Sequence, residues 1–179
     1  MTELSKAADV CIGNVLAASV VACLLFTGGC ASAGESAGRA SDRNGAEAAR
    51  KPLIVAHRGA SRAAPENTLP AFNLAWERGA DAIEGDFRRT KDGHIVCIHD
   101  ADTERVSEKD LVVSESSLEE LRALDVGAYR GEEYTGTVIP TLADVLEVVP
   151  AQKKIYIEIK GGKSMVPAVL REVRESDVG

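Results

Sequence analysis

Cysteine is scarce in the part of the chain that has a globular composition. Of the four cysteines, Cys11, Cys23 and Cys30 lie in or just after a leading apolar segment, and only Cys97 lies well beyond it. A single thiol cannot form an internal disulfide, and the cysteine spacings match no zinc-binding pattern. The sequence therefore excludes a disulfide-stabilised or zinc-stabilised domain for that part.

An excess of basic residues is also lacking. The 21 Lys and Arg residues are outnumbered by 28 Asp and Glu residues, which gives a formal net charge of −7. Non-specific nucleic-acid binding needs a basic surface, so we expect no nucleic-acid partner. A small anionic substrate is not excluded, because a metal or an arginine can reverse the field in one cleft. With 45% hydrophobic and 27% charged residues, the chain has a globular profile and can form one domain with a core.

The first 30 residues have the pattern of a signal peptide or membrane anchor. Residues 10–26 are almost uncharged and mostly apolar, and small residues precede Cys30. A Gly-Gly-Cys ending resembles a bacterial lipoprotein signal, in which the cysteine is acylated and becomes the mature N-terminus. An uncleaved anchor is the alternative, since the run approaches the length of a membrane span. We expect lipidation at Cys30 and a location outside the cytoplasm, in the periplasm or at the cell surface.

Residues 31–50 predict a flexible linker, and residues 51–179 predict an α/β domain. The linker consists of Ala, Ser, Gly and charged residues without an apolar period. In the domain, runs at 52–56, 80–90 and 155–160 have strand patterns, the first of them typical of a strand buried on both faces. Helices are expected after Asn67 or Thr68, after Ser116 and Ser117, after Thr141 and after Ser164. Alternating strands and helices indicate a parallel sheet.

Carboxylates interrupt two of the predicted strands. Glu84 and Asp86 lie two residues apart, as do Glu158 and Lys160. Side chains two apart on a strand point to the same face. A carboxylate pair in an otherwise apolar strand is costly unless it is paired or binds a cation. We expect Glu84, Asp86 and Glu158 to form an all-oxygen site for Ca²⁺ or Mg²⁺, with an ion pair of Glu158 and Lys160 as the simpler alternative.

Two histidines, His57 and His99, each follow a predicted strand. Strand ends carry the functional sites of α/β proteins, and histidine can give or take a proton near neutral pH. Arg58 offers a bidentate contact to a phosphate, and Lys160 adds a second positive charge. Two proton-transfer groups, two cations and a divalent metal together indicate phosphoryl chemistry. Glu66, by contrast, is interpreted as a turn residue before a helix.

Five segments taken in order resemble the glycerophosphodiester phosphodiesterase family. They are IVAHRGAS (54–61), PENTLPAF (65–72), GADAIEGDFRRTKDGHIVCIHD (79–100), IPTLADVL (139–146) and IYIEIK (155–160). The resemblance implies a (β/α)8 TIM barrel with its active site at the C-terminal strand ends. It implies a small-molecule substrate, a glycerophosphodiester, which is hydrolysed to sn-glycerol 3-phosphate and an alcohol.

The resemblance also implies a role for each site residue. His57 and His99 are the acid–base pair, and we expect His57 to accept a proton and His99 to donate one, a direction that the sequence does not fix. The metal ligands are Glu84, Asp86 and Glu158. The phosphate is held by Arg58 and Lys160.

A complete barrel of this type needs about 250 residues. The stretch from 51 to 179 has 129 residues, so we expect only about the first half of the barrel in this sequence. Two alternative interpretations remain. One is a related phospholipase- or sphingomyelinase-type phosphodiesterase on the same scaffold, and the other is an inactive, truncated, lipid-anchored remnant.

Overall fold

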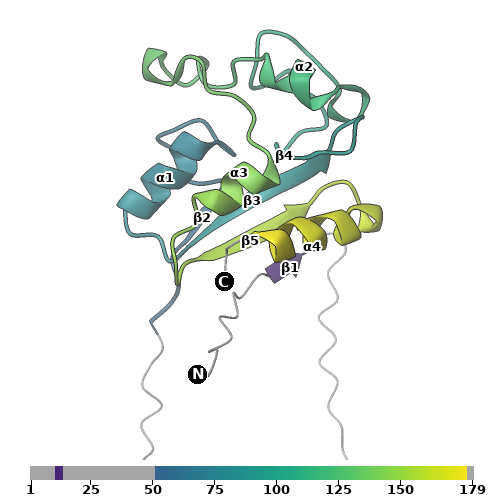
Figure 1. Cartoon of the computed structure of the whole chain (residues 1–179). Helices are drawn as coiled ribbons and strands as arrows, with labels where there is room; N and C mark the ends of the chain where they lie inside the picture. The colour runs from purple at the N-terminus through teal and green to yellow at the C-terminus, as the bar shows by residue number, and fades with distance from the viewer. Residues whose placement is uncertain (1–10, 14–50, 177–179) are drawn as a thin grey trace, which may run out of the picture. The chain divides into compact units, whose positions relative to one another are not determined.

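The computed structural model describes residues 11–13 and 51–176, in which five strands form one mainly parallel sheet (Figure 1). The strands are β1 (Cys11–Gly13), β2 (Val55–His57), β3 (Ala82–Arg89), β4 (Ile95–Cys97) and β5 (Lys154–Ile159). Along the sheet the order is β1-β5-β3-β2, with every neighbouring pair parallel. Strand β4 pairs antiparallel with the end of β3, as the second arm of a hairpin. The expected α/β pattern with a parallel sheet is confirmed.

Helices follow the strands, as the capping signals predict. They are α1 (Leu69–Glu77), α2 (Leu118–Arg122), α3 (Leu142–Glu147) and α4 (Val166–Glu175), with short 3₁₀ turns η1 (Val113–Glu115), η2 (Glu132–Tyr134) and η3 (Lys163–Met165). The hydroxyl of Thr68 accepts the N–H of Ala71 at the start of α1. Ser117 caps α2 and Thr141 caps α3, each in a reciprocal capping box. These side chains satisfy backbone N–H groups that have no partner inside the helix.

The helices α1, α3 and α4 pack on one face of the sheet (Figure 1). The main core there contains Phe72, Ile83, Phe87, Leu142, Val145, Leu146, Ile155, Ile157, Ile159 and Val169. Alternate residues of a strand point to opposite faces. The charged side chains of Glu84, Asp86 and Glu158 therefore project from the face opposite to the helices. One face of the sheet builds the core, and the other carries the polar residues.

A second, smaller core lies in the insert, which we define as residues 100–140 between β4 and α3. There the buried apolar residues of the insert pack against Val96 of β4 and Ile98, which directly follows it; those of the insert are Val106, Val113, Leu121, Leu124, Val126 and Ile139. The backbone of Cys97 also bonds to the carbonyl of Pro140 at 2.8 Å. The insert is therefore fixed to the end of β3 and β4, next to the polar face.

The first predicted strand differs from the expectation of burial on both faces. Only Val55–His57 are in β2, and Leu53, Ile54 and Val55 are 54%, 57% and 42% exposed. In the described sheet β2 pairs with β3 alone, and of its apolar residues Ala56 packs against the helix-covered core. A run of apolar residues does not reveal whether its strand has one neighbour or two.

Most of the expected leader and linker lies outside the described residues. This includes Cys30 and the whole of the segment 31–50. Of the expected leader, Cys11–Gly13 form β1, in parallel register with Tyr156–Glu158 of β5. Within the described ranges, every helix is too short or too polar to span a membrane.

Candidate active site

The structure brings the three predicted carboxylates together on the polar face of the sheet. The parallel register of β3 and β5 places Asp86 beside Glu158, and Glu84 lies two residues before Asp86. One carboxylate oxygen from each residue lies within 4.8 Å of the other two. The Asp86 side chain is fully buried, and those of Glu84 and Glu158 are largely buried. Three acids at this separation repel one another unless cations compensate them.

Two cations compensate part of this charge. The Nζ atom of Lys160 lies 3.1 Å from Oδ1 of Asp86 and 2.6 Å from Oε1 of Glu158. On the other side of Asp86, the Nε atom of Arg58 lies 3.1 Å from Oδ2. Glu84 accepts the backbone N–H of Arg58 at its Oε2 atom, at 3.0 Å. The other oxygen of Glu84, Oε1, is buried and lacks a hydrogen-bond partner among the described residues.

The pKa values of Glu84 and Asp86 shift in opposite directions. Burial raises the pKa of Glu84, and repulsion from Asp86 and Glu158 adds to the shift. Burial also acts to raise the pKa of Asp86, but hydrogen bonds from Asn67 and Lys160 outweigh it and leave the pKa lowered. Glu84 is thus the carboxylate with the least compensation. Among the described residues, Oε1 of Glu84 has neither a hydrogen bond nor an ion pair, and an all-oxygen set with such a buried oxygen fits a hard divalent cation such as Ca²⁺ or Mg²⁺.

Asn67 holds Asp86 in place. Its Nδ2 donates to Oδ2 of Asp86 at 2.9 Å, and its Oδ1 accepts the backbone N–H of Asp86 at 3.2 Å. The thiol of Cys97 donates to the same Oδ1 at 3.4 Å. Asn67 is buried and has a φ of 57°, a left-handed conformation that Asn tolerates better than most residues. The sequence pattern identified Asn67 only as a possible helix cap, a function that Thr68 performs instead.

A tight turn places His57 and Arg58 at the end of β2. The Nε2 atom of His57 lies 3.9 Å from Oε2 of Glu84, and the imidazole is 66% exposed. Arg58 and Gly59 both have positive φ, at 56° and 75°. A Cβ atom on Gly59 would lie 2.7 Å from the backbone carbonyl carbon of Ala71, so only glycine allows this approach to α1.

His99 follows β4, which pairs with the C-terminal end of β3. Its Nδ1 atom lies 2.8 Å from Oδ1 of Asp100, and its carbonyl accepts the Nε–H of Arg88 at 2.9 Å. His99 lines a small cavity together with Glu66 and Asn67. Among the described residues, no hydrogen bond or ion pair joins the imidazoles of His57 and His99 directly. The turn that follows His57 and the turn that carries His99 are instead connected through charged side chains.

Those connecting side chains are Glu66 and Arg105. Arg105 contacts both carboxylate oxygens of Glu66 at 2.8 and 3.0 Å, and its Nε lies 2.8 Å from Oδ2 of Asp100. Glu66 also accepts Nη1 of Arg58 at 3.0 Å. Burial acts to raise the pKa of Glu66 and of Asp100, but the contacts of each with Arg105 help to keep both values lowered. The sequence pattern did not indicate Arg105, because an arginine in a polar insert carries no local signal of its distant partner.

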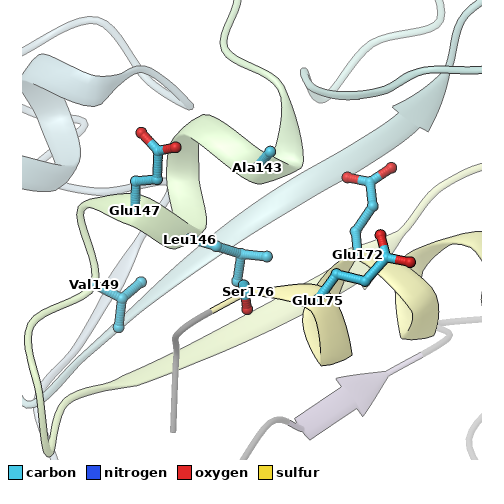
Figure 2. A pocket seen from close by; sticks show the side chains of 7 residues that line it. All are labelled: Ala143, Leu146, Glu147, Val149, Glu172, Glu175 and Ser176. Atoms are coloured by element: carbon cyan, nitrogen blue, oxygen red, sulfur yellow. The ribbon is translucent and has the colours of Figure 1, made fainter.

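A groove of about 430 Å³ lies elsewhere, between α3 and α4 (Figure 2). Leu146 and Val149 contribute apolar surface, and the carboxylates of Glu147, Glu172 and Glu175 also line it. None of the predicted site residues lines this groove. It is therefore separate from the acidic cluster.

Comparison with known proteins identifies relatives of this chain. Residues 57–175 match the model of the glycerophosphoryl diester phosphodiesterase family. A glycerophosphodiester phosphodiesterase of Caldanaerobacter subterraneus is 44% identical over 120 residues, which are 66% of this chain and 49% of that protein. A probable glycerophosphodiester phosphodiesterase 1 of Mycobacterium tuberculosis is 51% identical over 117 residues, which are 61% of this chain and 43% of that protein.

Comparison with solved structures also identifies phosphodiesterases as relatives. A phosphodiesterase of Oleispira antarctica, in complex with the product sn-glycerol-3-phosphate, is similar with a TM-score of 0.66 and 32% identity, over 71% of this chain and 55% of that one. A glycerophosphodiester phosphodiesterase of Agrobacterium tumefaciens has a TM-score of 0.64 and 35% identity, over 69% and 54%. This chain spans about half the length of these relatives, and its α/β unit covers part of their TIM-barrel fold. The chain belongs to the glycerophosphoryl diester phosphodiesterase family.

Proposed function

We propose that the protein hydrolyses glycerophosphodiesters to sn-glycerol 3-phosphate and an alcohol, and that it needs a divalent cation to do so. The observation that carries this proposal is the cluster of Glu84, Asp86 and Glu158, within 4.8 Å of one another and beside His57 and Arg58. The names of the relatives and the product bound to the Oleispira antarctica protein support this substrate class.

The three carboxylates would hold the cation, with Glu84 contributing the buried oxygen that has no other partner. A bound Ca²⁺ or Mg²⁺ would stabilise negative charge on the phosphate oxygens. Arg58 directs Nε toward Asp86 and Nη1 toward Glu66, so its remaining N–H groups can contact a phosphate. Lys160 adds a second positive charge at the same place.

His57 and His99 are proposed as the acid–base pair. His57 would take a proton from the attacking oxygen, and His99 would give one to the oxygen of the leaving alcohol. The phosphorus–oxygen bond to the alcohol breaks, and the net reaction adds one water. Asp100 accepts the Nδ1–H of His99, which leaves Nε2 as the nitrogen that faces the substrate.

A release assay on the intact protein tests this function. The protein is incubated with glycerophosphocholine or with sphingomyelin, before and after chelation, and then with Ca²⁺ or Mg²⁺ restored. We expect glycerol 3-phosphate from glycerophosphocholine, loss of the activity on chelation and recovery with metal. Cleavage of sphingomyelin alone would favour a sphingomyelinase-type enzyme, and no cleavage of either would favour an inactive remnant. Full activity in chelator would contradict the role of the metal.

We also propose that the leader is removed, together with β1, and that an acylated Cys30 anchors the protein outside the cytoplasm, as a lipoprotein in the periplasm or at the cell surface. The apolar run before Gly-Gly-Cys supports this proposal. Mass spectrometry of the protein from bacterial membranes should find a lipid-modified cysteine at the N-terminus. In Cys30→Ser, the lipid should be absent and the leader retained. An unmodified Cys30 within an intact leader would favour the uncleaved anchor.

A further inference from the structure

Arg105 has an unusual number of ionic contacts for a residue of the polar insert. Its guanidinium reaches Glu66 through Nη1 and Nη2, and it reaches Asp100 through Nε and Nη2, all at 2.7 to 3.0 Å. Such a planar fork fixes the direction of both carboxylates, which a single point charge cannot do. An isolated exposed ion pair contributes little, but this one joins two carboxylates into a network.

Each of these two carboxylates has a second partner near the site. Asp100 uses Oδ1 for Nδ1 of His99, at 2.8 Å. Glu66 shares its Oε1 with Nη1 of Arg58, at 3.0 Å. The turn after β2 and the turn after β4 are therefore joined through Arg105. Of the proposed acid–base pair, His57 is the last residue of β2, directly before the first turn, and His99 lies on the second turn.

Without Arg105, no single cation would hold the carboxylates of Glu66 and Asp100 next to each other. Glu66 and Asp100 carry like charges and bond to the same guanidinium, so its removal leaves them repelling each other. Asp100 has its side chain 32% exposed and could then turn toward water, which would release the imidazole of His99. His99 would keep its place at the end of β4 but lose its fixed ring orientation.

We propose that Arg105 is a positioning residue, which orients the ring of His99 through Asp100 and fixes this turn to the Arg58 turn through Glu66. This inference rests on the proposed function for its kinetic consequences. Within the described part of the chain, Arg105 forms no ion pair or hydrogen bond with Glu84, Asp86 or Glu158. Its effect should therefore appear mainly in the proton-transfer step, with a smaller effect on substrate binding through the contact of Glu66 with Arg58 and none on metal binding.

Steady-state kinetics of the intact protein test this distinction with Arg105→Gln. We expect kcat to fall by about 10- to 100-fold, as for other residues that orient a functional side chain, and KM to change less than kcat does. The matched control is Arg122→Gln, because Arg122 is similarly exposed, lies in the same insert and pairs with Asp144. A kcat equal to that of the control, or a raised KM at full kcat, would overturn the proposal.

Two further variants separate orientation from general stability. Arg105→Lys keeps the charge but not the fork, so it should recover stability while kcat stays below that of the parent. In a double-mutant cycle, Arg105→Gln should lower kcat no further once Asp100→Asn is present. Additive losses in the cycle, or full activity in Arg105→Lys, would show that Arg105 does not act through the orientation of Asp100.

A spectroscopic measurement keeps this test separate from the proposed function. In ¹⁵N-labelled protein, NMR reports which nitrogen of the neutral His99 imidazole carries the proton. We expect mainly the Nδ1–H form in the parent and in Arg122→Gln, and a mixture in Arg105→Gln. If the protein releases no glycerol 3-phosphate, the enzyme proposal fails while this result still decides the role of Arg105. Identical tautomers in all three proteins would overturn that role.

Discussion

The ammonium nitrogen of Lys160 lies 3.1 Å from Oδ1 of Asp86, although Asp86 lies in β3 and Lys160 directly follows β5. Asp86 is fully buried, so its negative charge depends on this contact and on that of Arg58. Lys160 also pairs with Glu158 and is itself largely buried. A metal ion bound by the cluster would therefore share two of its ligands, Asp86 and Glu158, with Lys160.

Lys160→Met should strengthen binding of Ca²⁺ or Mg²⁺ and weaken binding of substrate. The lysine competes with metal for Asp86 and Glu158, and it also supplies positive charge near the phosphate. We expect the metal affinity to rise about tenfold, or about 1.4 kcal/mol, as one charge-assisted hydrogen-bond donor is removed. Calorimetric titration measures the affinity, and the KM should rise. Lys163→Met, at an exposed position, should change neither quantity.

Divalent metal should stabilise the folded protein through the three carboxylates. A ligand at 100 times its Kd raises the free energy of unfolding by about 2.7 kcal/mol if it binds only the folded state. Thermal unfolding with and without Ca²⁺ or Mg²⁺ should show this gain as a higher Tm. In Glu84→Gln the gain should be mostly lost, because the partnerless oxygen is no longer charged.

The control for this experiment is Glu172→Gln in the groove between α3 and α4 (Figure 2). Burial raises the pKa of Glu172, as it does for Glu84, but Glu172 is not part of the cluster. This variant should keep the full metal-dependent rise in Tm. An equal loss of this rise in Tm in both variants would mean that the metal stabilises the protein through its overall negative charge and not through the cluster.

Two replacements of Asn67 should separate the contribution of its hydrogen bonds to stability from that of its left-handed backbone conformation. Asn67→Gly accepts the φ of 57° but leaves groups of the buried Asp86 without partners, at a cost of about 1–3 kcal/mol in stability. Asn67→Ala adds the strain of a left-handed conformation, about 1 kcal/mol more. Denaturant unfolding measures both costs. Equal stabilities of the two variants would show that the conformation is not strained.

Asp125 should contribute to acid sensitivity of the insert. Backbone N–H groups of Gly136, Gly127 and Ala128 donate to its carboxylate, and these bonds lower its pKa from 3.8. A lowered pKa adds stability above the unfolded-state value, and this stability is lost as pH falls through the folded-state value. Denaturant unfolding from about pH 5 downward should therefore show a weaker pH dependence in Asp125→Asn than in the parent. An identical dependence would contradict this role.

The polar face of the sheet could be predicted because strand periodicity is local. The spacing of Glu84 and Asp86 places both side chains on one face, whichever strands are neighbours. Capping residues such as Thr141 likewise identified the starts of helices. The alignment of Asp86 with Glu158 follows from the parallel register of β3 and β5.

Contacts between distant segments could not be predicted in the same way. Glu66 and Arg105 are 39 residues apart, and both are common surface residues, so neither carries a mark of its partner. Asn67 was interpreted from its neighbours in sequence, whereas its bonds are to Asp86. The exposure of Leu53 and Ile54 depends on which strands flank β2, which an apolar run does not encode.

The histidine pair is tested most directly by glycerol 3-phosphate release from glycerophosphocholine in three alanine variants of the intact protein. The chain has three histidines, and His94 is an exposed residue near Asp92, away from the cluster. We predict that His57→Ala and His99→Ala each lose at least about 100-fold in kcat, the scale of general acid–base catalysis, while His94→Ala keeps full activity. Full activity in either His57→Ala or His99→Ala would contradict the mechanism.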